Sequence, residues 1–208
     1  MNENEELTKE IGTLKDKMWN TSRIRIKTAE RLISNANFLE NMSAYYSISL
    51  AMFSIVSLLY GNKLFDLINV LLSVALLGIV YYGNSINFRE RYNKMKDNYL
   101  SIERAYYNLL AKEKTINFED LSGIYDDYNN ILNKVENHIL YDYLAHLIDE
   151  NKKHTKEEND KDKKMKFLEL NLRKYKFNKI VGFLLKSIVV IIPVIVGVYS
   201  IIIIANNK

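Results

Sequence analysis

The 208-residue chain carries 29 Lys and Arg against 25 Asp and Glu, and its net charge of +4 is too small to indicate nucleic-acid binding. It has no cysteine, which excludes disulfides, thiolate metal sites and cysteine nucleophiles. Seven glycines and one proline are few turn formers for this length, so long helices are favoured over many short strands.

Residues 1–42 are predicted to form an N-terminal amphipathic helix. They begin with the polar stretch MNENEELTKEIG, so we expect no cleavable signal peptide. Apolar residues then follow the 4-3-4 spacing of one helix face: Leu7, Ile11, Leu14 and Met18. Small residues on a second face would let a neighbouring helix approach closely: Ser22, Ala29 and Ala36.

A transmembrane helical hairpin is predicted over residues 43–83. In that range the only charged residues are Lys63 and Asp66, both in the break GNKLFD. Each flanking run holds about 18 residues, or roughly 27 Å of helix, close to the ~30 Å hydrocarbon thickness of a bilayer. Tyrosine and phenylalanine gather at the ends of both runs, as in interfacial belts. A buried hairpin of a soluble protein is the alternative, but it would usually keep a polar helix face.

The break itself has the residues of a minimal turn. Gly61 and Asn62 tolerate the left-handed backbone that ends a helix. Asp66 then lies at the start of the next helix, where a negative charge suits the helix dipole. We therefore expect a turn too small to act as an external receptor.

Residues 165–208 are predicted to form an amphipathic helix that leads into a third span, at about 184–205. The run from Ser187 to Asn207 has no charge and contains the only proline, Pro193. Membrane helices tolerate proline better than soluble helices do.

Basic clusters predict the orientation of the spans. They precede the first run, follow the second and precede the third: Lys15, Lys17, Arg23, Arg25, Lys27 and Arg31; Arg89, Arg91, Lys94, Lys96 and Arg104; Arg173, Lys174, Lys176, Lys179 and Lys186. The break holds only Lys63. By the positive-inside rule, we predict a multi-pass protein of the cell inner membrane with a cytoplasmic N-terminus and middle region.

Residues 84–150 are predicted to form a cytoplasmic helical bundle. A coiled-coil seam keeps 4-3 spacing over three heptads: Phe88, Tyr92, Met95, Tyr99, Ile102, Tyr106 and Leu109. We expect a continuous helix to join the second span to this seam, and the seam to support a homo-oligomer. Asn117 is the expected N-cap of a further helix that runs to about residue 150. Residues 151–164 read as a charged linker.

Catalytic motifs are missing from the sequence. It has no glycine-rich phosphate loop and no nucleophile motif, so we predict neither an enzyme nor a cofactor or metal site. His138, Asp142 and His146 recur every four residues, a spacing that could bind a metal on one helix face. Hydrogen bonds within a helical bundle explain the same stripe more simply.

Small and polar residues mark one stripe on each run of the hairpin. The candidates are Ser47 and Ser54 on the first run, and Asn69 and Ser73 on the second. Such residues mediate close helix packing in membranes. In an oligomer they could also line an aqueous pore, and the two interpretations are compatible. Within the runs there is no Glu, Arg or His, which disfavours a proton relay.

The element SRIRIKTAERL, the tight hairpin and the following SINFRERYNKMKDNYLSIERAYYNLL resemble the SLATT proteins over most of residues 20–112. The later ENHILYDY and the third apolar run are similar to the fifth SLATT subfamily. The family-like positions are Arg23, Arg25, Lys27, Asn87, Phe88, Arg89 and Tyr92. SLATT proteins are two-transmembrane effectors named for their association with SMODS nucleotidyltransferases and SLOG domains, and they offer no catalytic residues to transfer.

The resemblance implies an all-α membrane effector of a bacterial anti-phage defence system. On an infection signal it would form a pore or disrupt the inner membrane, causing growth arrest or cell death. A reverse transcriptase or a nucleotidyltransferase of the same operon is the implied functional partner. The alternatives are a non-conducting, membrane-tethered coiled-coil scaffold and a holin-like protein, although long cytoplasmic helices fit a holin poorly.

Overall fold

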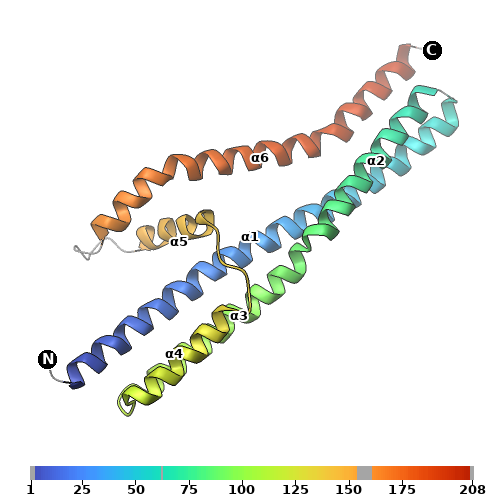
Figure 1. Cartoon of the computed structure of the whole chain (residues 1–208). Helices are drawn as coiled ribbons and strands as arrows, with labels where there is room; N and C mark the ends of the chain where they lie inside the picture. Colours follow the sequence, from blue (N-terminus) through green and yellow to red (C-terminus); the bar gives the residue numbers. More distant parts are fainter. Residues whose placement is uncertain (1–2, 62, 154–160, 207–208) are drawn as a thin grey trace. The chain divides into compact units, whose positions relative to one another are not determined.

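The computed structural model describes residues 3–61, 63–153 and 161–206, and within these ranges the chain is helical with no strand (Figure 1). The six helices are α1 (Glu3–Tyr60), α2 (Lys63–Ile86), α3 (Phe88–Lys112), α4 (Phe118–Leu132), α5 (Leu140–Lys153) and α6 (Lys161–Asn206). Half of the linker predicted over 151–164, residues 154–160, lies outside the described residues, whereas 151–153 end α5 and 161–164 begin α6.

The chain divides into two compact units. The first, here called the bundle unit, comprises Met1–Ile33 and Arg89–Leu172. The second, here called the span unit, comprises Ser34–Phe88 and Arg173–Lys208. The boundary falls inside α1, inside α3 after its first residue, Phe88, and inside α6.

The core of the bundle unit lies between α1, α3 and α4. The buried residues come from the predicted face of α1, from the predicted seam on α3 and from α4 and the turn before it: Ile11, Leu14, Met18, Ile102, Leu109, Ile116, Leu121 and Tyr128. The small residues Ser22 and Ala29 are also almost fully buried. This burial confirms that a second face of α1 serves close packing.

Helix α4 begins where the sequence predicts and ends earlier than expected. Asn117 is its N-cap: the Asn117 side chain accepts from the Asp120 amide at 2.8 Å, and the Asp120 carboxylate accepts from the Asn117 amide at 3.4 Å. The prediction of one helix continuing to about residue 150 is wrong, because α4 stops at Leu132 and α5 starts at Leu140.

In the span unit, two helices end with the same left-handed cap. Gly61 has φ of 57° and its amide donates to the Ser57 carbonyl at 2.8 Å. Asn87 has φ of 51° and its amide donates to the Gly83 carbonyl at 3.0 Å. Gly and Asn are the residues that adopt this conformation most readily. Asn62 lies outside the described residues, and the expected continuity of α2 with α3 is interrupted at Asn87.

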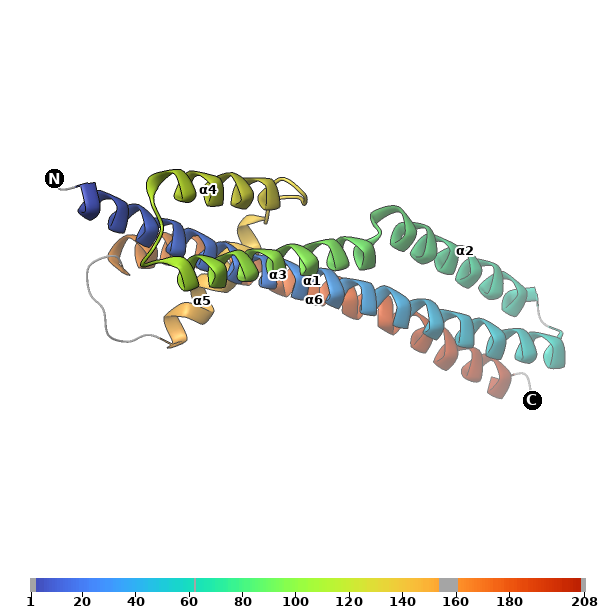
Figure 2. The same cartoon turned by 90° about the horizontal axis from the view of Figure 1, so that it is seen from below.

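Helix α2 folds back along the second half of α1, and α6 runs beside the same part of α1 (Figure 2). The face that α2 turns towards these helices has 4-3 spacing: Phe65, Asn69, Leu72, Leu76, Ile79, Gly83 and Ile86. On α6, Gly197 lies against the Phe53 ring of α1, 3.6 Å from where a Cβ would stand. Small residues here permit the close approach typical of membrane helices.

Large apolar side chains cover the outside of the span unit. Leu58 is 85% exposed, and Leu77, Phe183 and Ile201 are each more than half exposed. Three helices, containing α1, α2 and α6, are long and apolar enough to cross a membrane. A hydrophobic exterior of this extent needs lipid rather than water as its solvent. The predicted fold class, an all-α membrane protein, is confirmed.

Candidate functional site

The basic segment of α1 binds the C-terminal end of α4. Arg25 is 2% exposed, and its Nη2 donates to the Leu132 carbonyl at 3.1 Å. The Asn98 amide of α3 donates to the neighbouring carbonyl of Ile131. The last carbonyls of a helix lack partners within the helix, so these donors stabilise the end of α4 at Leu132. Burial lowers the pKa of Arg25 from its usual value.

The same segment of α1 binds the first turn of α5. Asp142 is 1% exposed and accepts hydrogen bonds from the Thr28 hydroxyl at 3.0 Å and from Arg31, whose Nε lies at 2.7 Å and Nη2 at 3.0 Å. One turn earlier, Lys27 pairs with Asp149 at 2.7 Å. The family-like basic residues Arg25 and Lys27 therefore hold α4 and α5 against α1.

The residues of the predicted polar stripe do not gather around a metal site. His138 precedes α5, Asp142 is engaged by Arg31, and His146 lies 3.7 Å from Glu150. Burial lowers the pKa of His138 below the ordinary value for imidazole, which favours the neutral ring at pH 7. Among the described residues, no group of three or more His, Cys, Asp or Glu side chains could hold a metal ion.

The predicted seam on α3 is used partly within one chain. Met95, Ile102 and Leu109 are buried, whereas the four aromatic positions, Phe88, Tyr92, Tyr99 and Tyr106, are half-buried. The Tyr106 ring lies 5.6 Å from the ring of Trp19. The apolar half of the seam thus packs inside the bundle unit, and its aromatic half borders the surface.

An aromatic surface patch of the bundle unit comprises Trp19, Tyr106 and Tyr107. Trp19 is 41% exposed and Tyr107 is 60% exposed. The guanidinium of Arg23, another family-like residue, stacks over the Trp19 ring at 4.0 Å. Aromatic and arginine side chains are the residues that dominate protein–protein contacts.

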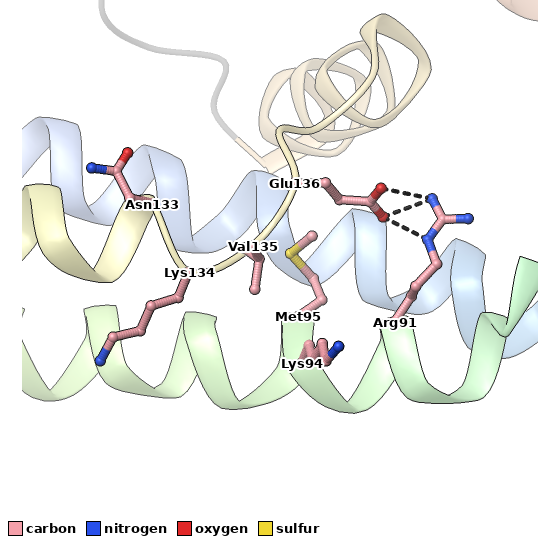
Figure 3. A pocket seen from close by; sticks show the side chains of 7 residues that line it. All are labelled: Arg91, Lys94, Met95, Asn133, Lys134, Val135 and Glu136. Atoms are coloured by element: carbon pink, nitrogen blue, oxygen red, sulfur yellow. Dashed lines mark hydrogen bonds and ion pairs between the residues drawn. The ribbon is translucent and has the colours of Figure 1, made fainter.

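A cavity of about 300 Å³ opens beside the α4–α5 connection (Figure 3). Arg91 of α3 holds Glu136 of the connection in a two-pronged ion pair with distances of 2.7–2.9 Å. Lys94 and Lys134 also line it, and Lys94 pairs with Glu90 at 2.6 Å. Arg91 and Lys94 already have carboxylate partners, so they are not available to bind an anionic ligand. We therefore interpret the cavity as a structural contact that holds the α4–α5 connection against α3.

The four polar candidates of the hairpin are divided between two environments. Ser47 and Ser54 are exposed on α1, and each hydroxyl donates to the carbonyl four residues earlier, at 2.8 Å. Asn69 and Ser73 are half-buried on α2, and within the described part of the chain no donor reaches the enclosed side-chain oxygen of Asn69. In a single chain, the four residues therefore do not form one exposed stripe.

Near the tip of the hairpin, Ser57 of α1 donates a hydrogen bond to the carboxylate of Asp66 on α2. Ser57 is 7% exposed and was not among the predicted candidates. Ser57 lies three residues after Ser54 but on a different side of α1: Ser54 is exposed, whereas α2 covers Ser57. This hydrogen bond fastens the two spans beside the turn.

A second contact that the sequence analysis missed joins α1 to α6. Pro193 has no N–H, so it cannot bond to the carbonyl of residue 189, four positions earlier in the helix. The hydroxyl of Tyr46, 2% exposed, donates to that Val189 carbonyl at 2.9 Å. In a membrane a freed carbonyl must find a donor from a neighbouring helix. In the sequence, the only indication of this contact is the proline within the charge-free run, because it leaves one helix carbonyl without its usual donor.

We expect Tyr46→Phe to weaken the packing of α6 on α1 by about 1–2 kcal/mol, because the Val189 carbonyl then has no donor in hydrocarbon. In a Pro193→Ala background the same substitution should have little effect, since the residue 193 amide replaces the hydroxyl. The free energy of this packing is measured by energy transfer between labels at Leu58→Cys and Ile201→Cys, followed during titration with a denaturing detergent. Tyr45→Phe is the matched control, and an equal loss in both backgrounds would contradict the pairing.

Comparison with protein families gives one match. The family described as SMODS and SLOG-associating 2TM effector domain family 5 matches residues 7–200, which cover most of both units and most of the three apolar helices. No curated protein matches the chain. No solved structure matches it either. The match confirms the resemblance found in the sequence. The chain belongs to the fifth SLATT family of two-transmembrane effector domains.

Proposed function

We propose that the protein is a membrane effector of a bacterial anti-phage defence system, which assembles on an infection signal and opens a pore in the inner membrane. The family name supports the effector role and the association with SMODS and SLOG domains. The three apolar helices support action at the membrane.

The observation that carries the pore proposal is the small, polar surface of α1. Ser47, Ala51 and Ser54 are exposed among Ile48, Met52 and other large apolar side chains that suit lipid. Small residues on a membrane helix favour contact with another helix over contact with lipid. Neighbouring chains would cover this surface, and in an open state its hydroxyls would face water. Since three mostly apolar helices cannot enclose water alone, a pore needs several subunits.

Asn69 gives a reason for a second state of the spans. Its side-chain oxygen is buried without a donor, and an unsatisfied buried acceptor is unfavourable by about 1–3 kcal/mol. A rearrangement that brings water to Asn69 would recover this free energy. This contribution favours a hydrated arrangement of the spans, and in our proposal the activating signal supplies the rest of the free energy needed to reach it.

The proposed orientation places the N-terminus and the bundle unit in the cytoplasm and the turn at Gly61 outside, following the basic clusters. The signal would then come from the cytoplasm, from a nucleotidyltransferase or a reverse transcriptase encoded nearby. Because the chain lacks cysteine, single substitutions map the topology cleanly. In intact spheroplasts, a membrane-impermeant maleimide should label the Lys63→Cys variant. It should label the Lys112→Cys variant only after the membrane has been permeabilised. The reverse labelling would contradict the orientation.

The pore proposal is tested by membrane potential. Induced expression with the activating partner should collapse the potential within minutes, reported by a voltage-sensitive dye, before cell density falls. A protein that reaches the membrane in full amount and leaves the potential intact would contradict it.

A membrane-tethered scaffold is the second candidate, and the aromatic surface patch of Trp19, Tyr106 and Tyr107 favours it. A scaffold would dock a cytoplasmic partner there and conduct nothing. Its expected result is growth arrest that depends on the partner while the membrane potential stays intact.

A further inference from the structure

A cavity of about 430 Å³ lies in the span unit between α1, α2 and α6. It is lined by apolar side chains and one charged residue, Lys186; Phe38, Met42, Gly78, Tyr82 and Leu185 are among the other lining residues. Its volume falls within the range of roughly 300–1,000 Å³ typical of small-molecule sites.

The lining residues come from one end of all three apolar runs. Met42 directly precedes the first run, Tyr82 closes the second, and Lys186 directly precedes the charge-free run that begins at Ser187. Tyrosine and lysine are the side chains that sit at headgroup depth, with their apolar stems towards the hydrocarbon. The cavity therefore opens at the border of the membrane.

Among the residues that the structure describes, Lys186 has no Asp or Glu partner. Its ammonium donates to the side-chain oxygen of Asn35 at 3.0 Å and lies 4.9 Å over the ring of Phe38. Both contacts orient the ammonium, and neither neutralises it. A ligand with an anionic part and an apolar part would suit this site, because the anion would pair with the ammonium and the apolar part would fill the cavity.

The rest of α6 adds positive charge on the same side of the run. Arg173, Lys174, Lys176 and Lys179 are exposed, and no Asp or Glu occurs between Arg173 and the end of the chain. Clusters of this kind next to a span attract anionic lipid, and basic pockets between spans hold phosphate headgroups.

We propose that this cavity is a specific site for one anionic phospholipid, with an acyl chain against Gly78 and Leu185 and its phosphate paired with Lys186. Gly78 leaves room for the chain, since a Cβ placed there would meet nothing within 4 Å. The proposal concerns the resting protein and does not depend on pore formation.

Native mass spectrometry of the full chain in detergent tests the site. Added phosphatidylglycerol should be retained at one molecule per chain, about tenfold more strongly than phosphatidylcholine. Lys186→Gln should bring the two lipids to near parity, because a glutamine can still donate to Asn35 but carries no charge. Lys186→Arg should restore the preference.

Gly78→Leu should lower the retention of both lipids several-fold by filling the cavity. The matched controls are Gly182→Leu and Lys179→Gln on α6, which lie outside the lining and should leave retention unchanged. Equal retention of the two lipids by the unaltered chain, or a preference that survives Lys186→Gln, would overturn the proposal and indicate unspecific annular lipid.

Discussion

Asp142→Ala should lower the free energy of opening of α5 by about 3–5 kcal/mol. The substitution removes a carboxylate that is 1% exposed and leaves the Arg31 guanidinium and the Thr28 hydroxyl without their shared partner. Breaking this ion pair from one side is destabilising, because the Arg31 side chain is only 22% exposed and its charge stays partly desolvated. Hydrogen exchange of the α5 amides in the detergent-solubilised full chain measures this free energy.

The same two helices supply the control. Lys27 and Asp149 also join α1 to α5, but the Asp149 side chain is 43% exposed. Exposed ion pairs contribute about 0.2–1 kcal/mol, so Asp149→Ala should change the opening free energy by no more than that. Replacing both buried partners, as in Arg31→Met with Asp142→Leu, should recover most of the lost stability. If Asp142→Ala and Asp149→Ala lowered the opening free energy of α5 equally, the ion pair between Arg31 and Asp142 would not be the main contact that holds α5 on α1.

The elements that the sequence predicted correctly depend on neighbours in the chain. The Asn117 cap and the left-handed Gly61 follow from a few residues, because satisfaction of first-turn amides and freedom from a Cβ act within one turn of helix. The apolar runs follow from about 18 consecutive residues, because hydrocarbon solvation acts along a whole uninterrupted segment. Patterns of this kind can be recognised without knowing the fold.

The elements that were missed depend on partners far away in the chain. The end of α4 at Leu132 is stabilised by Arg25 and Asn98, and nothing in the sequence around Leu132 marks it as strongly as a glycine or proline would. Likewise, Pro193 indicates that the carbonyl of Val189 lacks its helical donor, but only the fold shows that the Tyr46 hydroxyl replaces that donor. The polar residues of the hairpin stay a prediction: the sequence shows their types, and only the fold shows that Ser47 and Ser54 are exposed while Asn69 is half-buried.

Within the family-like basic element, charge has two separate uses. In the proposed orientation, the summed charge of the cluster would keep the N-terminus in the cytoplasm by the positive-inside rule. Its individual members, Arg25, Lys27 and Arg31, make directed contacts to α4 and α5. Arg25→Lys would keep the cluster charge but lose the reach of a guanidinium, so it separates structural stabilisation from orientation.

Ser54→Leu and Asn69→Leu should each reduce the partner-dependent collapse of membrane potential at least tenfold. On α1, leucine replaces an exposed hydroxyl and adds bulk to the surface proposed for subunit contact and pore lining. On α2, leucine removes the side-chain oxygen of Asn69, which is buried without a donor, and this removal stabilises the packed spans over a hydrated state. Asn69→Leu should therefore also raise resistance to unfolding by detergent, whereas Ser54→Leu should leave it unchanged.

Two exposed, lipid-suited positions on the same helices provide the controls. Met52 is 64% exposed on α1 and Val70 is 58% exposed on α2, and Met52→Leu and Val70→Leu should preserve the collapse of potential. All four variants must reach the membrane in equal amounts for the comparison. If Ser54→Leu and Asn69→Leu collapse the potential as fast as these controls do, the polar residues of the hairpin do not line a conducting path, and the pore proposal fails. If the unaltered chain arrests growth with its potential intact, the scaffold is the correct function.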